Sequence, residues 1–214
     1  MSQSLPLQEF ISTFPVRQFK KGDMIVCEGL IPRKCYAIKK GFVKVFLPTR
    51  NGDEKAVAFN TVNDIIPLAW TFKKAPAPLY YYQSFTDCEV YEMSREDFLT
   101  YTQDNPAVFK KLFHYLLDLD IGLKQHIHSL EQAKALDKLL NAFNFLAKRF
   151  GEPVSDGKIR MTLPLTQQDL ANFLGLTRET TGAQLKDLQT KGIISYQHQQ
   201  YVIHTKKLLA ALEE

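Results

Sequence analysis

The sequence LTQQDLANFLGLTRETTGAQLKDLQTKGII, residues 165–194, predicts two short helices joined by a tight turn. Thr166 is placed to cap the first helix, and Gly175 supplies the turn that ends it. Thr177 is placed to cap the second helix, which begins at Arg178. Two short helices joined by a glycine-containing turn are typical of a helix-turn-helix.

The start of the second helix predicts contact with DNA. In a helix-turn-helix this end of the recognition helix meets base edges in the major groove. Arginine can read guanine through two hydrogen bonds, and glutamate can accept one from cytosine N4, so we expect base reading by Arg178 and Glu179. Phosphate contacts fix register without reading sequence. We expect them from Thr166, Gln168, Thr177, Thr180 and Lys186.

The residues around the two helices predict a wing. Residues 192–195 and 201–203 are apolar runs on either side of a polar turn at 197–200, and 158–163 add a third strand. A helical hairpin without a role in DNA binding is the alternative interpretation. The agreement of caps, turn and wing favours the DNA-binding one.

The upstream half predicts a small antiparallel β-sandwich, roll or barrel. Short apolar runs separated by turn residues occur at 24–27, 35–38, 42–46, 56–59, 80–82 and 88–93. The sequence Asn51-Gly52-Asp53 is a strong hairpin signal between two of these runs.

A long helix is predicted between the two halves, from Pro106 to Glu131. Its apolar residues alternate in spacing by three and four, which is the seam of a coiled coil and favours pairing with a second copy of the chain. A single amphipathic helix packed on its own β domain is the alternative. The seam residues are Phe109, Leu112, Leu116, Leu119, Leu123, His126 and Leu130.

A second helix is expected after a hinge near Leu136, with Asp137 as its N-cap. The predicted domains are therefore a β domain over 1–104, a dimerisation helix and hinge over 105–136, and a DNA-binding domain over 137–214.

Composition excludes several classes of protein. The chain of 214 residues is 45% apolar and 23% charged, which is near the globular average. No apolar run approaches the ~18 residues of a membrane span, and the start MSQSLPLQEF does not resemble a secretory signal. Three widely spaced cysteines, Cys27, Cys35 and Cys88, argue against a disulfide framework. We therefore expect a cytoplasmic protein.

The net charge of +4 is mild and permits nucleic-acid binding without requiring it. Residues 1–133 carry 16 basic and 15 acidic side chains, whereas residues 134–214 carry 11 and 8. Most of the excess therefore lies in the half that contains the helix-turn-helix, although ordinary surface variation explains it equally well.

The run at 165–194 resembles the winged helix-turn-helix of the Crp/Fnr superfamily of bacterial transcription regulators. The upstream half resembles that family's cyclic-nucleotide-binding β-roll in KKGDMIVCEG (20–29), CYAIKKGFVKVF (35–46) and CEVYEMSREDF (88–98). The resemblance implies an α+β fold with an N-terminal β-roll, a long dimerisation helix and a C-terminal winged helix-turn-helix. It also implies a homodimer on a palindromic double-stranded DNA site, with RNA polymerase as a protein partner.

The resemblance also bears on the recognition helix. Arg178 and Glu179 match the family's reading pair, and Gly182 is compatible with it and joins the expected base-reading set. Ala183 stands where many members carry a second base-reading arginine. The expected half-site keeps the G·C pairs read by Arg178 and Glu179 and loses discrimination at the third position.

The phosphate-binding cassette of cyclic-AMP-binding members is not matched. An ungapped register from Asp64 to Met93 puts Pro67-Leu68 where those members have Gly-Glu, and Pro78-Leu79 where they have Arg-Ser/Thr. None of these side chains can neutralise a phosphate, and an unpaired buried anion costs several kcal/mol. We therefore predict no binding of cyclic AMP through this cassette, although Lys73 and Lys74 offer charge from a new position.

The segment around the cassette is apolar and aromatic. Either its own side chains fill the pocket, or the pocket takes a less charged effector. The residues of the candidate effector pocket are Pro67, Leu68, Trp70, Pro78, Leu79 and Tyr81.

No metal or cofactor is expected. Three scattered cysteines do not supply the four thiolates of an iron–sulfur sensor, and all five histidines follow the β region. Cys27 and Cys35 are either a redox pair or buried core thiols. No catalytic arrangement stands out, so an enzyme is not expected. The alternative function is a β-roll interaction module whose winged helix is only structural.

Overall fold

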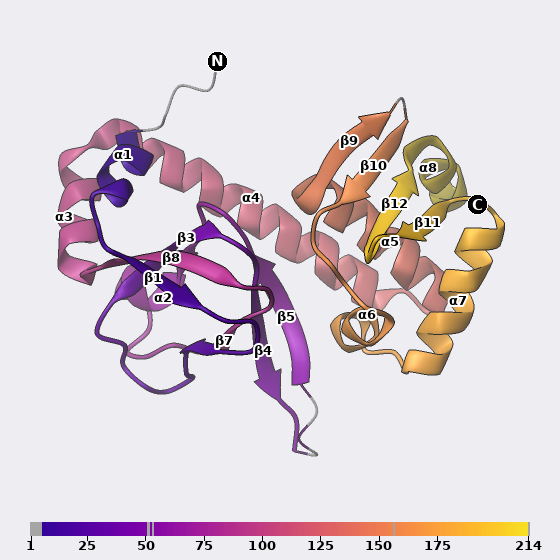
Figure 1. The fold of residues 1–214 in the computed structure, drawn as a ribbon, viewed down its shortest axis with the longest axis horizontal. Helices are drawn as coiled ribbons and strands as arrows, with labels where there is room; N and C mark the ends of the chain where they lie inside the picture. Colours follow the sequence, from indigo (N-terminus) through magenta and orange to yellow (C-terminus); the bar gives the residue numbers. More distant parts are fainter. Residues whose placement is uncertain (1–5, 51, 53, 156, 214) are drawn as a thin grey trace. The chain divides into compact units, whose positions relative to one another are not determined.

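The computed structural model describes residues 6–50, 52, 54–155 and 157–213 (Figure 1). The chain divides into two compact units, Met1–Tyr115 and Leu116–Glu214, which we call the β unit and the C-terminal unit. The predicted α+β fold is confirmed, with antiparallel sheets first, a long helix next and a helix-rich end that carries a hairpin wing. No helix in the described part of the chain is long and apolar enough to cross a membrane.

The β unit contains two four-stranded antiparallel sheets, with strand orders β1-β8-β3-β6 and β2-β7-β4-β5. The turn expected at Asn51-Gly52-Asp53 joins β4 to β5, but Asn51 and Asp53 lie outside the described residues. The strands are β1 (Val16–Phe19), β2 (Met24–Val26), β3 (Cys35–Lys40), β4 (Val43–Pro48), β5 (Glu54–Asn60), β6 (Ile65–Ile66), β7 (Tyr81–Ser84) and β8 (Cys88–Met93).

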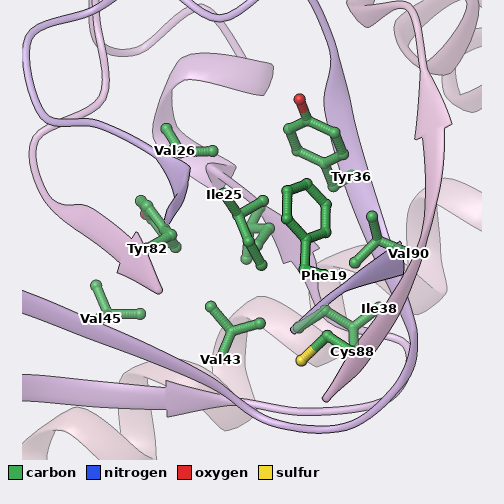
Figure 2. Packing of buried hydrophobic residues seen from close by; sticks show 11 residues of the cluster. Phe19, Ile25, Val26, Tyr36, Ile38, Val43, Val45, Tyr82, Cys88 and Val90 are labelled. Atoms are coloured by element: carbon green, nitrogen blue, oxygen red, sulfur yellow. The ribbon is translucent and has the colours of Figure 1, made fainter. Parts of the chain in front are cut away.

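The interior of the roll is filled by side chains from both sheets (Figure 2). Alternate residues of β3 point to opposite faces, as the pleat of a strand requires. Tyr36 and Ile38 therefore join this interior cluster, whereas Cys35 and Ala37 join a second cluster with the helices. The interior cluster consists of Phe19, Ile25, Val26, Tyr36, Ile38, Val43, Val45, Ile66, Tyr82, Cys88 and Val90.

The helices of the β unit cover the other face of β3 and β8. They are α1 (Pro6–Ser12), α2 (Leu68–Thr71), α3 (Arg95–Asp104) and the first part of α4 (Pro106–Glu131). Phe98 of α3 and Val108 of α4 are almost fully buried in the second cluster, together with Trp70 of α2. The Tyr115 hydroxyl donates a hydrogen bond of 2.9 Å to the buried Asp64 carboxylate, which fixes α4 to the turn before β6.

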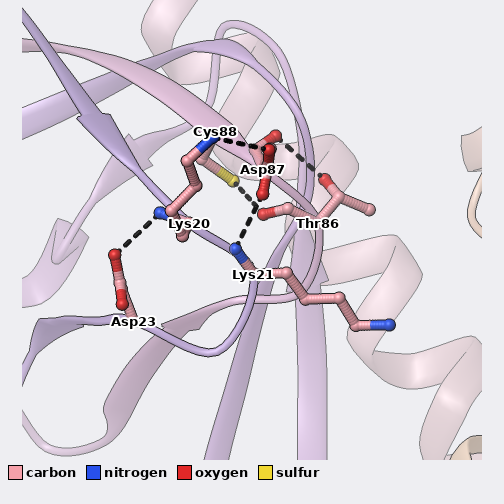
Figure 3. A network of polar contacts seen from close by, with 6 residues as sticks. All are labelled: Lys20, Lys21, Asp23, Thr86, Asp87 and Cys88. Carbon is pink, nitrogen blue, oxygen red and sulfur yellow. Dashed lines mark hydrogen bonds and ion pairs between the residues drawn. The ribbon is translucent and has the colours of Figure 1, made fainter.

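Polar contacts fix the turn between β1 and β2 (Figure 3). The Lys20 amide donates to Asp23 at 2.7 Å, and the Lys21 amide donates to Asp87 at 2.9 Å.

The backbone of Asp87 leaves no room for a side chain at position 41. Gly41 has φ +93°, and a Cβ there would lie 2.4 Å from the Asp87 carbonyl oxygen, so only glycine fits.

The 26 residues of α4 span about 39 Å and match the predicted bounds. Two residues of the predicted seam, Leu112 and His126, are only 5% and 6% exposed and pack inside their own units, so their place in a dimer seam stays a prediction. Phe113 and Ile127 are exposed instead. Leu112 and Phe113 are both apolar and adjacent, so the seven-residue repeat fits either face and only tertiary packing decides between them.

The C-terminal unit contains the rest of α4 and then α5 (Ala135–Phe150), α6 (Gln167–Leu174), α7 (Arg178–Thr190) and α8 (Thr205–Glu213). Its antiparallel sheet has the order β11-β12-β10-β9. The strands are β9 (Gly151–Ser155), β10 (Lys158–Met161), β11 (Ile194–Gln197) and β12 (Gln200–His204).

Two features of this unit differ from the prediction. The N-cap of α5 is Lys134, and Asp137 lies inside the first turn, where a carboxylate stabilises the helix dipole. The strand β9 was not predicted, since it contains Pro153 and is mostly exposed, as edge strands often are.

Candidate nucleic-acid interface

Side-chain caps hold α6 and α7 at the predicted positions. Thr166 and Asp169 form a capping box, in which the Thr166 hydroxyl accepts from the Asp169 amide at 3.1 Å and the Asp169 carboxylate accepts from the Thr166 amide at 2.8 Å. Gly175 ends α6 in the left-handed conformation, φ 64°. The Thr177 hydroxyl then accepts from the Thr180 amide at 3.1 Å and begins α7.

One side of α7 is buried in the unit and the other is exposed. Thr181, Leu185 and Leu188 are buried, and Ala171 of α6 has no exposed surface where the two helices pack. The other side, which we call the reading face, consists of the half-buried Gly182 and the exposed Arg178, Glu179, Ala183 and Lys186.

The charged side chains of the reading face are available for a ligand. Within the described residues, Arg178, Glu179 and Lys186 have no side-chain hydrogen bond or ion pair, and each is exposed. Charged groups held at the start of an exposed helix can donate to and accept from base edges without first breaking a contact inside the protein.

Of the five residues expected to contact phosphate, some already use their side-chain donors in hydrogen bonds within the protein. The Thr166 and Thr177 hydroxyls donate to Asp169 and Thr180, so both are engaged in capping. The Gln168 amide donates to Asn172 at 2.9 Å. Among the described residues, the Thr180 hydroxyl and the Lys186 ammonium donate to no acceptor. These two side chains can therefore donate to a phosphate without breaking a hydrogen bond.

The structure explains Gly182 by packing. A Cβ at Gly182 would lie 3.2 Å from Oε1 of Gln167, so the missing side chain leaves room for Gln167 beside α7. Gln167 is exposed at the start of α6 and was not among the predicted site residues. A glutamine at the first position of the first helix was the only available sequence signal, and it does not reveal the contact with Gly182.

The wing is a tight hairpin anchored on α5. His198 and Gln199 form its tip with φ of 50° and 63°, the left-handed values that a two-residue hairpin turn needs. Tyr201 of β12 is 3% exposed, and its ring meets Phe143 of α5 edge-to-face at 5.2 Å. Burial raises the pKa of the Tyr201 hydroxyl, which therefore stays neutral.

His126 of α4 packs against α6. Its ring stacks on Phe173 of α6, with centroids 3.9 Å apart and planes 11° apart, and lies 6.4 Å from Phe145 of α5. Its Nδ1 atom is buried without a hydrogen-bond partner. Burial lowers the pKa of the imidazole to about 4, so the ring is neutral near pH 7 and serves as an aromatic packing group.

The six candidate effector residues do not share one environment. Leu68 and Trp70 pack in the helix-covered cluster of the β unit, and the Arg95 guanidinium lies 4.5 Å from the centroid of the Trp70 ring. Tyr81 stacks on Phe46 at 5.5 Å, and Leu79 is 54% exposed. Pro67 and Pro78 are buried.

Cys35 has no exposed surface, and its thiol lies 3.6 Å from the Met93 carbonyl oxygen. Burial raises the pKa of this thiol to about 12, which favours the interpretation of a core thiol over a redox pair with the half-buried Cys27. The described residues contain no group of three or more side chains that could hold a metal ion.

An exposed reading helix, a capped first helix and a hairpin wing define a winged helix-turn-helix DNA-binding protein, preceded here by a β-roll. Two family models match the chain: the cyclic nucleotide-binding domain over residues 16–105 and the Crp-like helix-turn-helix domain over residues 110–212. The chain therefore belongs to the Crp/Fnr family, and it is a DNA-binding transcription regulator, not an enzyme.

Similar proteins support this assignment. The cAMP-activated global transcriptional regulator CRP of Salmonella typhimurium is 23% identical over 199 residues, which cover 92% of this chain and 93% of that protein. Electron transport regulator A of Shewanella oneidensis is 27% identical over 201 residues, covering 91% and 78%. The solved structure of FixK2 from Bradyrhizobium japonicum has a TM-score of 0.77 at 21% identity, covering 93% and 96%.

Proposed function

We propose that this regulator is a homodimer that pairs through α4 and binds a palindromic DNA site. An exposed apolar stripe along α4 supports pairing, because such a stripe is unfavourable in water and a partner helix would bury it. We call it the α4 stripe, and it consists of Phe109, Phe113, Leu116, Leu117, Ile121, Leu123, Ile127 and Leu130.

The exposed Arg178-Glu179 pair at the start of α7 carries the proposal of base reading. In a two-fold symmetric dimer each subunit would place its own α7 in the major groove, and the two half-sites would lie ~34 Å apart. Thr180 follows the pair directly and Lys186 lies two turns further along α7; both would bind the DNA backbone, which sets register. In this proposal the chain consists of a sensor-like domain (1–104), a dimerisation helix and hinge (105–136) and a DNA-binding domain (137–214).

We also propose that cyclic AMP is not the effector. Pro67 and Pro78 are buried, and neither they nor Leu68 and Leu79 bring a charge or a hydrogen-bonding side chain to a phosphate. Packed apolar side chains fill the interior of the roll, which is unfavourable for a charged ligand. We therefore propose that the effector is small and uncharged, or that there is none. An effector that acts must bind one arrangement of the dimer better than the other. The proposed protein partner is RNA polymerase, and the proposed location is the cytoplasm.

Fluorescence anisotropy with a palindromic duplex obtained by binding-site selection tests this function. We expect salt-sensitive, sequence-specific binding. It should weaken by at least about 30-fold in Arg178→Ala, because the homodimer loses a pair of hydrogen bonds to guanine in each half-site and each pair is worth ~1–3 kcal/mol. Lys55→Ala is the matched control, since it removes one positive charge from an exposed strand of the β unit. Equal binding by the Arg178→Ala protein and the wild type would remove the proposed role of Arg178. Absence of sequence-specific binding would favour a β-roll module with a purely structural winged helix.

A further inference from the structure

The middle of the reading face carries no polar side chain. Arg178 and Glu179 lie at one end of this face and Lys186 at the other, with Gly182 and Ala183 between them. The Ala183 methyl is exposed, whereas Gly182 presents only backbone next to Gln167. Ala183 is therefore the one residue of the reading face that offers DNA an apolar side-chain group.

Polar neighbours do not compete with Ala183 for the bases at this point. Gln184 is half-buried and lies toward the packed side of α7, one turn before Leu188. The Asp187 carboxylate forms an ion pair of 2.8 Å with Lys191, the C-cap residue of α7. Both polar side chains next to the Ala183 methyl are thus directed or paired elsewhere.

The helix geometry places the Ala183 contact relative to the one made by Glu179. Residues four apart lie on the same face of a helix, and four residues rise about 6 Å along its axis. Stacked bases are ~3.4 Å apart along one strand. The base opposite Ala183 therefore lies about two steps from the base pair read by Glu179.

We propose that Ala183 reads thymine through the C5-methyl group of that base. The thymine methyl is the one apolar group that the base edges present in the major groove, and alanine is among the side chains that contact it. This inference rests on the proposed function of α7, and it replaces the sequence-based expectation that no discrimination remains at this position. The preferred half-site then contains a thymine about two base pairs from the G·C pair of Glu179.

The test removes a single methyl group from the DNA. In the duplex selected by the wild-type protein, each thymine of both half-sites is replaced in turn by deoxyuridine, which keeps every hydrogen-bonding group. We expect affinity to fall about fourfold at one symmetric pair of positions, the effect of ~0.8 kcal/mol for one buried methyl group. Replacement of thymines outside the half-sites should leave affinity unchanged.

Two variants assign the methyl effect to Ala183. In Ala183→Gly and Ala183→Ser the wild-type difference between thymine and deoxyuridine should shrink to less than 1.5-fold (about 0.25 kcal/mol). Using both guards against the lower helix propensity of glycine. Specific DNA binding with no methyl-sensitive thymine, or with one that stays sensitive in both variants, would overturn the inference alone. Failure of the wild type to select any site would overturn the proposed function as well.

Discussion

Mild acid should destabilise the C-terminal unit through His126. The imidazole stacks on Phe173 at 3.9 Å, its Nδ1 has no partner, and the ring is 6% exposed. Its pKa is about 4 in the folded protein, against the ordinary value of 6.5 that we take for the unfolded chain. Because the folded pKa is the lower one, the unfolded chain binds the proton first as the pH falls. The free energy of unfolding therefore decreases between pH 6.5 and 4.

The size of the effect follows from these two pKa values. Each pH unit between them costs ~1.4 kcal/mol of stability, so the whole window is worth about 3 kcal/mol. At pH 7 the His126 ring is mostly neutral in both states, whereas at pH 5 it is mostly protonated in the unfolded chain and mostly neutral in the folded chain. Between pH 7 and pH 5 this single group should therefore remove about 2 kcal/mol.

Urea unfolding at pH 7 and pH 5 measures this loss for the wild type and for His126→Phe, which keeps an aromatic ring against Phe173. Other groups also titrate in this range, so the informative quantity is the difference between the two proteins. The wild type should lose about 2 kcal/mol more than the variant. His128→Gln is the matched control, because His128 is exposed two residues further along α4. An equal loss of stability in the wild type and in His126→Phe would show that protonation of His126 does not destabilise the folded protein.

Two further predictions concern the dimer and the effector. Ile127→Asp places a charge in the α4 stripe and should convert the dimer to a monomer at micromolar concentration, as measured by analytical ultracentrifugation. Lys110→Asp is the control at an exposed polar position of the same helix and should leave the dimer intact. An unchanged dimer in Ile127→Asp would remove the α4 stripe from the interface. Cyclic AMP at 1 mM should leave the melting temperature unchanged, because a ligand present at 100 times its dissociation constant would add ~2.7 kcal/mol of stability. A rise of several degrees would show that the nucleotide binds.

The sequence was sufficient wherever short-range chemistry decides the structure. The Thr166 and Thr177 hydroxyls each accept a hydrogen bond from the amide three residues further on, and Gly175 supplies a left-handed turn. The helix α6 therefore begins and ends, and α7 begins, where the sequence predicts. The bounds of α4 were also predictable, since proline begins the helix and a long apolar period sustains it.

Tertiary packing decides the features that were not predictable. Leu112 packs against Phe98 and Val108 of its own unit, but the sequence pattern alone fits a dimer seam equally well. The contact between Gln167 and Gly182 joins two helices and has no local signal. The N-cap of α5 is Lys134 and not the predicted Asp137, because Ala135 and Leu136 are already helical. Lys134 makes no side-chain capping bond.

Binding-site selection from random DNA by the wild-type protein shows whether two copies of α7 read two half-sites. We expect an enriched palindrome whose half-site centres lie ~34 Å apart, about one turn of the duplex, with G·C pairs that Arg178 and Glu179 can read. Enrichment of a lone half-site, or of no sequence at all, would contradict it.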